Sequence, residues 1–230
     1  MTGRLALVLL GAAIGCSGLT EGEGGVVGIE VGVPGPDTVE VREAIQLSAR
    51  ALDKDGNSTG AAVTWVSADA TATIDASTGV LTGVSPGTAR VQATVGALSS
   101  GLITFAVVAP ADTLLLPGDS IFTVARDVAA LPDLVTRLDS FDPAGPLSGR
   151  GVIYAITSPD PAATAPAVLL TGNVAADTIA TTTDGTATAR LIVLAGATAP
   201  DSVVVQVRAE RTRGAVVPGS GARFIVRFLP

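Results

Sequence analysis

Apolar and polar residues alternate one by one along several stretches of this chain. In residues 202–209, one face carries Val203, Val205, Val207 and Ala209. A period of two places alternate side chains on opposite faces of a β-strand, so this stretch is predicted to be a half-buried strand of an antiparallel sheet. The same period recurs in residues 44–51, 88–95 and 223–228. The alternation therefore predicts an all-β chain.

The composition agrees with many short strands joined by tight turns. Ala, Val, Thr and Gly are abundant, aromatic residues make up 3% of the chain, and there are 14 prolines. This mixture disfavours long helices. In the second half of the chain, further strands are predicted at residues 120–126, 134–139, 151–157, 167–170 and 186–194.

The first sixteen residues carry an export signature. Arg4 and the amino terminus are positively charged, an apolar run spans Leu5 to Ile14, and small residues precede Cys16. This pattern resembles a bacterial lipoprotein signal, which implies residues 1–15 as a cleavable signal peptide and lipid on the sulfur and new amino terminus of Cys16. The ten apolar residues are too few to cross a bilayer, which takes about 20. The alternatives are an export signal without lipid, and a buried or unpaired thiol at Cys16.

The residues after the cysteine suggest a tether and two domains. By analogy with bacterial lipoproteins, an Asp after Cys16 would favour the inner membrane, and Ser17 stands there instead, which favours the outer membrane or the cell surface. Residues 16–26 are polar and rich in glycine, as expected of a flexible tether. Removing 15 residues from 230 leaves 215, which suits two domains of about 100 residues each. We predict these domains at residues 27–108 and 111–230.

The order of motifs in the first module resembles a known domain family. Trp65-Val66-Ser67 is followed by a segment that ends in Ile74-Asp75, then by Gly79-Val80-Leu81-Thr82 and by Gly87-Thr88-Ala89. This order is similar to the group 2 bacterial immunoglobulin-like domain. The resemblance covers residues 27–108 and implies a β-sandwich that serves bacterial surface and secreted proteins as a spacer or adhesive module. It implies no enzyme.

A weaker set of motifs marks the second module. Residues 182–189 read Thr-Thr-Asp-Gly-Thr-Ala-Thr-Ala, a turn that leads into an alternating strand. This resembles the group 1 bacterial immunoglobulin-like domain of the invasin and intimin type, and implies a second immunoglobulin-like β-sandwich over residues 111–230. Residues 127–146 depart from that pattern. Only a few residues around Pro110 separate the modules, so we expect a semi-rigid, rod-like arrangement.

The side chains that most often carry catalysis are scarce. The chain has no histidine and only one cysteine, which excludes serine–histidine and cysteine–histidine mechanisms. A net charge of −7 argues against nucleic acid as a partner, because phosphate binding needs clustered Lys and Arg. An enzyme would have to use paired carboxylates. Most carboxylates of the second module neighbour Pro or Gly and are interpreted as turn formers; they are Asp133, Asp139, Asp142, Asp160 and Asp184.

Aromatic and charged residues are assigned to core and surface respectively. Trp65 shares a strand face with Val63 and is interpreted as a core anchor rather than a platform for stacking sugars. Phe224 is also expected to be internal, and Tyr154 is the only tyrosine of the chain. A charged hairpin end is interpreted as a solvated rim; it contains Arg208, Glu210, Arg211 and Arg213.

Asp53, Asp55 and Asn57 lie in a segment that looks like the start of a calcium-binding loop. Such a loop needs Gly at position 6 and Glu at position 12. Counted from Asp53, Gly56 is at position 4 and Thr64 at position 12, so the pattern fails. A turn between two strands explains the same residues more simply. A calcium site at the loop rim is the alternative, and no other cofactor is predicted.

Together these features predict a non-catalytic, lipid-anchored protein of the cell envelope that acts as an adhesion or spacer module. Its predicted partners are the membrane, through the lipid on Cys16, and an unknown protein or glycan on a surface. The alternative is a glycan- or polysaccharide-binding surface protein. A glycan-binding protein of this kind would be expected to expose an aromatic residue on which a sugar could stack.

Overall fold

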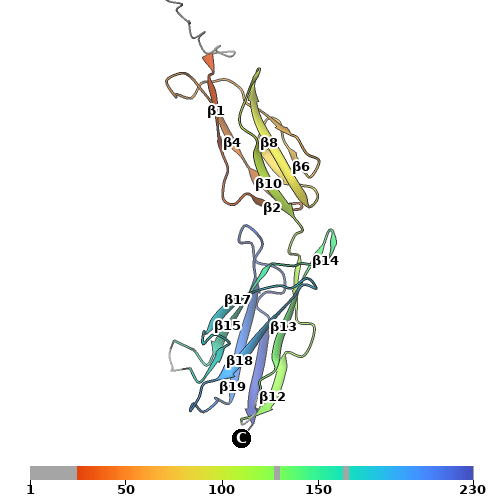
Figure 1. The fold of residues 1–230 in the computed structure, drawn as a ribbon, viewed down its shortest axis with the longest axis vertical. Coiled ribbons are helices and arrows are strands. Elements are labelled where there is room, and N and C mark those ends of the chain that lie inside the picture. Colours follow the sequence, from red (N-terminus) through yellow and green to blue (C-terminus); the bar gives the residue numbers. More distant parts are fainter. Residues whose placement is uncertain (1–24, 127–129, 163–165, 230) are drawn as a thin grey trace, which may run out of the picture.

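The computed structural model describes residues 25–126, 130–162 and 166–229. The regular elements in these ranges are β-strands, and they form two β-sandwiches that stand end to end (Figure 1). The predicted all-β fold of two tandem sandwiches is confirmed. Within the described ranges, no helix is long and apolar enough to cross a membrane. The predicted signal peptide, Cys16 and most of the predicted tether lie outside these ranges.

One layer of the first sandwich is a continuous sheet in the order β2-β10-β8-β5, with β9 paired to β8. Its strands are β2 (Thr38–Glu40), β5 (Thr64–Ser67), β8 (Gly87–Val95), β9 (Leu98–Ser99) and β10 (Ile103–Val108). β2 runs parallel to β10 and places Glu40 opposite Val108, whereas the other pairs are antiparallel. The end of β2 therefore lies beside the point where β10 leaves the sandwich.

The facing layer is divided into two short sheets. β1 (Gly28–Gly32) pairs with β4 (Ser48–Leu52), and β7 (Val80–Gly83) lies between β3 (Ala44–Gln46) and β6 (Ala72–Ile74). The prediction of one strand over residues 44–51 is wrong, because the chain changes sheet at Leu47. The alternation nevertheless continues through the change, since Ile45, Leu47 and Ala51 are all buried in the core.

The core of the first sandwich is organised around Trp65, which is 4% exposed. Gly79 lies against its indole ring with φ at +75°, and a Cβ on Gly79 would be 2.6 Å from Trp65 Nε1. Glycine is required there both by the left-handed backbone and by the close approach. A small satellite cluster contains Val26, Ala51 and Val95, so the core begins one residue before the predicted start of the domain.

The second sandwich has two five-stranded sheets. One has the order β11-β13-β18-β16 with β14 paired to β13, and the other has the order β12-β20-β19-β15-β17. The first consists of β11 (Thr113–Leu115), β13 (Asp133–Phe141), β14 (Ala144–Pro146), β16 (Val168–Leu170) and β18 (Thr186–Val193). The second consists of β12 (Ile121–Ala125), β15 (Gly151–Ser158), β17 (Ala176–Ala180), β19 (Ser202–Ala209) and β20 (Arg223–Leu229). The described part of residues 127–146, which fit no pattern in the sequence, thus contains β13 and its hairpin with β14.

The core of the second sandwich encloses a buried polar pair. Tyr154 is fully buried and donates its hydroxyl proton to the Ala187 carbonyl at 2.7 Å, while its oxygen lies 2.6 Å from Thr136 Oγ1. Phe224 is also buried, and its ring stacks on Phe122 with the centroids 6.4 Å apart. The predictions that Trp65 and Phe224 are internal are confirmed.

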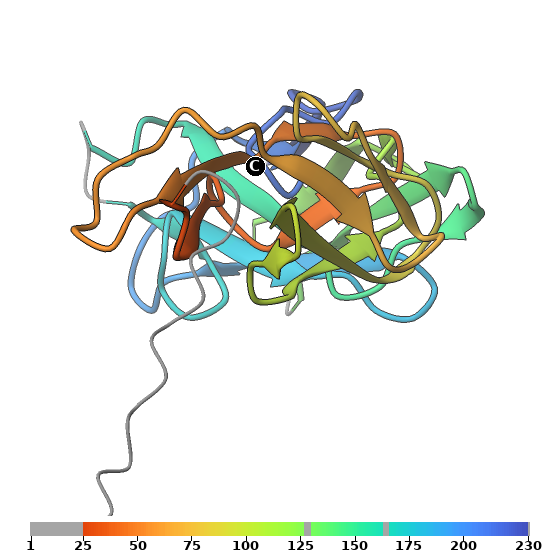
Figure 2. The same cartoon turned by 90° about the horizontal axis from the view of Figure 1, so that it is seen from above.

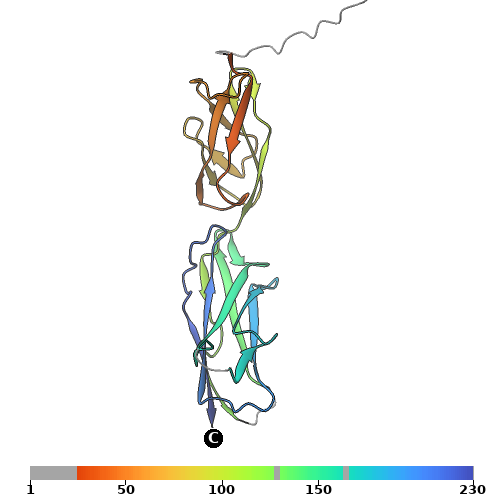
Figure 3. The same ribbon diagram turned by 90° about the vertical axis from the view of Figure 1, so that its left-hand side faces the viewer.

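The two sandwiches share one long axis. A view down that axis shows the first sandwich lying over the second (Figure 2), and the perpendicular view shows a single strand of chain passing from one to the other (Figure 3). The connecting residues are not exposed: Pro110, Ala111 and Asp112 are all buried. A buried linker implies that other parts of the chain pack around it.

Candidate functional site at the joint between the sandwiches

Glu40, the last residue of β2, is fully buried at the end of the first sandwich. Asp112, in the linker, is also buried, and these two are the only charged side chains that are buried in the part of the chain that the structure describes. A buried carboxylate is tolerated only when cations and hydrogen-bond donors surround it. Both carboxylates therefore need ion-pair or hydrogen-bond partners, and these partners lie where the two sandwiches meet.

The donors around Glu40 come from the linker and the second sandwich. Arg150 pairs with Oε1, which also accepts the backbone N–H of Thr212 at 3.2 Å. Oε2 accepts the backbone N–H of Ala111 at 3.3 Å and lies 3.4 Å from Nη1 of Arg211. The Glu40 carboxylate of the first sandwich is thus surrounded by two guanidinium groups of the second sandwich and by two backbone N–H groups, one from the linker and one from the second sandwich.

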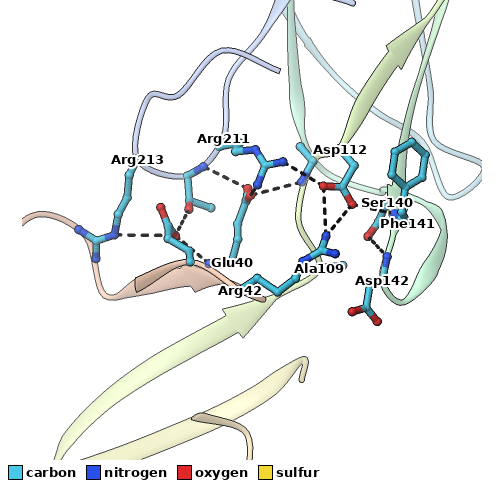
Figure 4. Close-up of polar contacts among 12 residues, drawn as sticks. Glu40, Arg42, Ala109, Asp112, Ser140, Phe141, Asp142, Arg211 and Arg213 are labelled. Atoms are coloured by element: carbon cyan, nitrogen blue, oxygen red, sulfur yellow. Dashed lines mark hydrogen bonds and ion pairs between the residues drawn. The ribbon is translucent and has the colours of Figure 1, made fainter. Parts of the chain in front are cut away.

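Arg211 joins the two buried carboxylates. Its Nη1 faces Glu40, and its Nη2 donates to Asp112 Oδ1 at 2.9 Å (Figure 4). The planar guanidinium presents its donors in a fixed fork, so a single arginine can hold two acceptors at once. Asp112 Oδ2 in turn accepts the backbone N–H of Phe141 at 2.8 Å, which ties the joint to the β13–β14 hairpin.

Arg42 reaches the same carboxylate from the first sandwich. Its Nη2 lies 3.3 Å from Asp112 Oδ2, and its backbone has φ at +69°. A left-handed conformation is unfavourable for a residue with a long side chain. Arg42 adopts it two residues after the end of β2, and its guanidinium is directed across the joint (Figure 4).

Arg213 clamps the outer side of the joint. Its Nη1 and Nη2 donate to the carbonyl oxygens of Pro34 and Pro36, both at 2.6 Å, and its buried Nε lies 4.0 Å from Glu43 Oε2. Both carbonyls belong to the segment between β1 and β2, outside any strand, so no sheet partner competes for them. The joint therefore contains side chains from both modules on each side of the linker.

The prediction that the Arg208–Arg213 hairpin end is a solvated rim is wrong for Arg211 and Arg213. Only the Arg208–Glu210 pair remains largely exposed. Arg211 contacts Glu40, 171 residues earlier, and Asp112, 99 residues earlier, and Arg213 contacts Pro34, 179 residues earlier. No local pattern could have revealed them, although a cluster of three arginines in a chain with 14 basic residues was a signal of unusual density.

The predicted calcium ligands form a turn. Asp53 Oδ1 accepts the backbone N–H groups of Asp55 and Asn57 at 2.9 and 2.8 Å, and Lys54 Nζ lies 2.9 Å from Asp55 Oδ2. The hydrogen bond from the Asn57 backbone, above all, lowers the pKa of the Asp53 carboxyl. These contacts use Asp53 as a turn cap, and the alternative calcium site stays a prediction.

The carboxylates of the second module have two different roles. Asp160 and Asp184 act as turn formers, as predicted, because Asp160 accepts the Ala162 N–H at 2.9 Å and Asp184 accepts the Thr186 hydroxyl at 2.9 Å. Asp133 and Asp139 instead lie on β13 and pair with arginines on its exposed side. The Asp133 partner is Arg190, whose hydrogen bond lowers the pKa of the Asp133 carboxyl. No cluster of three or more potential metal ligands occurs among the described residues.

Comparisons with known proteins identify a domain family in the first sandwich. Residues 34–104 match the bacterial Ig-like domain (group 2), as the motifs in that module predicted. No curated protein matches the chain. The resemblance of the second module to the group 1 domain stays a prediction.

Several solved structures are similar to most of the chain. Domains 4 and 5 of the S-layer protein SbsC match at 14% identity and a TM-score of 0.33, covering 89% of this chain and 99% of that chain. The Yersinia pseudotuberculosis adhesin InvE matches at 17% identity and a TM-score of 0.35, covering 85% of this chain and 57% of that chain. The Escherichia coli adhesin FdeC matches at 16% identity and a TM-score of 0.46, covering 88% of this chain and 64% of that chain. The chain thus spans less than two thirds of the two adhesin structures.

Proposed function

We propose that this chain is a non-catalytic, lipid-anchored protein of the cell surface, in which two immunoglobulin-like sandwiches form a rigid spacer for adhesion. The observation that carries the proposal is the joint around Glu40. A flexible pair of domains needs only a linker, whereas this pair has a buried linker and a network of buried charges across the contact. Such a network requires one fixed geometry, because each charge is stable only while its partners remain in place.

The group 2 immunoglobulin-like match supports the proposal for the first module. The side chains of Trp65, Tyr154 and Phe224 are buried in the cores, and the carboxylates at the joint are engaged by arginines and backbone N–H groups. These arrangements serve stability and geometry. We infer that the molecule holds a surface feature at a defined distance from its membrane anchor.

Rigidity is tested by measuring the distance between two labels. Because Cys16 is the only cysteine, a Cys16→Ser background permits spin labels at cysteines introduced for the exposed residues Thr104 on β10 and Thr123 on β12. Pulsed electron double resonance is expected to give one narrow distance distribution. The same labels in a Glu40→Ala variant are expected to give a broad one. A broad distribution in the unmodified joint would overturn the rigid-spacer proposal.

The anchor is tested separately by metabolic labelling with a fatty acid. The wild-type chain is expected to incorporate label and the Cys16→Ser variant to incorporate none. Equal labelling of the two would contradict lipid attachment at Cys16. It would not bear on the rigidity of the joint, which the distance measurement tests.

A further inference from the structure

The divided layer of the first sandwich contains a hollow. Where the chain passes from β3 to β4, the β1–β4 sheet separates from the β3–β7–β6 sheet, and a hollow of about 350 Å³ opens between β4, residues 58–63 and the turn at Ser77 and Thr78. Trp65 lies on its floor, projecting from the opposite layer. This volume falls in the range of small-ligand sites.

The edge of β4 is unpaired at one residue beside this hollow. In an antiparallel pair, successive residues direct their backbone groups to alternate edges of the strand. Val27 N–H donates to Leu52 on the β1 side, whereas the Ala51 carbonyl accepts the Thr59 N–H and the Leu47 N–H donates to Gly79, both on the other side. Ala49 lies between these two residues in the same alternation, so its N–H and C=O are directed toward the hollow. No backbone hydrogen bond within the described ranges satisfies them on that side.

The Trp65 side chain offers a second unsatisfied donor. The residue is 4% exposed, and its indole N–H makes no hydrogen bond to any residue that the structure describes. An indole N–H is a donor only, so without a protein partner it is free to donate to a ligand. Thr59 adds a hydroxyl that accepts the Ala61 N–H at 3.3 Å and has its own proton left to donate. Donors and an acceptor therefore converge on a hollow whose lining also includes the apolar side chains of Ala61 and Val63.

The charge of the hollow defines the ligand class. Its lining contains no carboxylate, and its single cation, Arg50, is paired with Glu30 on the neighbouring strand. A metal ion or an anion therefore finds no uncompensated charge there. An extended peptide is also a poor fit, because the Ala51 carbonyl and the Leu47 N–H on either side of Ala49 are already engaged. A compact, neutral ligand with several hydroxyl groups fits best.

We propose that this hollow binds one neutral sugar unit of a glycan. Each sugar hydroxyl both donates and accepts, which matches the N–H and C=O of Ala49, the Trp65 indole and the Thr59 hydroxyl. The C–H face of the sugar would lie against Ala61 and Val63. The site requires neither the lipid anchor nor the rigid joint, so it stands or fails independently of the spacer proposal.

The sole tryptophan of the chain makes the site directly observable. Purified full-length protein is titrated with glucose, galactose, mannose, N-acetylglucosamine, cellobiose and chitobiose while Trp65 fluorescence is recorded. At least one sugar is expected to shift the emission in a saturable manner. A response to none of the six would overturn the proposal.

Two variants of the hollow and one matched control locate the binding. Thr59→Val removes one hydroxyl from the hollow at nearly constant size, and is expected to weaken binding about fivefold, the equivalent of one net hydrogen bond. Trp65→Phe keeps a ring in the core and removes the indole N–H, with binding followed by calorimetry. Thr104→Val makes the same change as Thr59→Val on exposed β10, outside the hollow. Unchanged affinity in both hollow variants, or an equal loss in the control, would contradict the assigned site.

Discussion

The Glu40 carboxylate of the first sandwich accepts the backbone N–H of Thr212 in the second, at 3.2 Å. The donor is part of the main chain, so the contact depends on the position of the whole Arg211–Gly214 turn and not on the identity of one side chain. The Arg211 N–H and carbonyl are themselves bonded to Ala215 and Gly214 within that turn. The contact thus couples the fold of one module to the orientation of the other.

Replacing Glu40 with glutamine should uncouple the sandwiches. The amide keeps the size of the side chain but leaves the Arg150 and Arg211 guanidinium groups without a buried counter-charge. Breaking one partner of a buried ion pair costs about 3 kcal/mol or more. We expect the free energy of unfolding to fall by about that amount and one thermal transition to separate into two, as measured by calorimetry.

Glu30 provides the control for that experiment. It pairs with Arg50 on the surface of the first sandwich, and both side chains are more than half exposed. Exposed pairs contribute about 1 kcal/mol or less. Glu30→Gln should therefore leave both the stability and the number of transitions nearly unchanged, and an equal effect of the two substitutions would refute the special role of the joint.

Arg211→Lys should weaken the joint although it preserves the charge. A lysine ammonium is a compact charge and cannot hold Glu40 and Asp112 in the same fork. We expect a loss of about 1–2 kcal/mol in the free energy of unfolding, measured by chemical denaturation. Arg208→Lys, in the exposed pair with Glu210, is the matched control and should change stability little. Equal losses in the two variants would contradict the bridging role of Arg211.

Gly79→Ala should disturb the first core. The substitution places a side chain at φ +75° and a Cβ 2.6 Å from Trp65 Nε1. We expect a loss of about 2 kcal/mol or more in stability together with an altered Trp65 emission spectrum. Gly56→Ala isolates the backbone contribution, because Gly56 has φ at +81° and a Cβ there would meet no atom within 4 Å. Its expected loss is about 1 kcal/mol, with no spectral change.

Tyr154 should ionise only at very high pH. Burial in the second core raises the pKa of its phenol to about 12, against a contribution in the opposite sense from the Thr136 hydrogen bond. Because the folded pKa lies above the unfolded value of about 10, the stabilisation is complete below that value and is lost as pH rises toward 12. As the only tyrosine in the chain, Tyr154 can be followed by tyrosinate absorbance. Ionisation near pH 10 in a chain that is still folded would contradict its burial.

Asp75 should make the first sandwich sensitive to acid. Its Oδ1 accepts the backbone N–H of Thr78 at 2.7 Å and the Ser77 hydroxyl at 2.8 Å, and these bonds hold the pKa of Asp75 far below its usual range. A depressed folded pKa gives stability that is present above the unfolded value of about 4 and is lost as pH falls below it. Asp75→Asn should flatten this part of the pH–stability curve. If Asp75→Asn had the same pH–stability curve as the wild type between about pH 4 and 2, the depressed pKa of Asp75 would be contradicted.

Much of the architecture could be predicted because it depends on local pattern. Alternation identified β8, β19 and β20, and the motif order around Trp65 identified the first sandwich. The break of the predicted 44–51 strand could not be seen, since Ile45, Leu47 and Ala51 face one core through both strands. Alternation shows which side chains face the core. It does not show which neighbouring strand a segment is hydrogen-bonded to, so it could not reveal the change of sheet.

The joint was inaccessible to the sequence for a related reason. Glu40 follows an ordinary Thr-Val pair in β2, and Arg211 belongs to a segment whose composition is typical of exposed hairpins. Their contact arises only when two separate modules meet across a buried linker. The interpretation of Asp133 as a turn former was likewise wrong, because proximity to Pro132 suggested a turn while its strand neighbour Arg190 lies 57 residues away.

The parallel strand pairs in both sandwiches have a mechanical consequence. β2 runs parallel to β10 in the first sandwich, and β12 runs parallel to β20 in the second. Tension applied along the long axis pulls the members of each pair in opposite directions along their length, so the hydrogen bonds between them are loaded together in shear instead of being opened one after another. The buried linker carries that load from β10 of the first sandwich to β11 of the second. A chain built in this way resists stretching along its long axis.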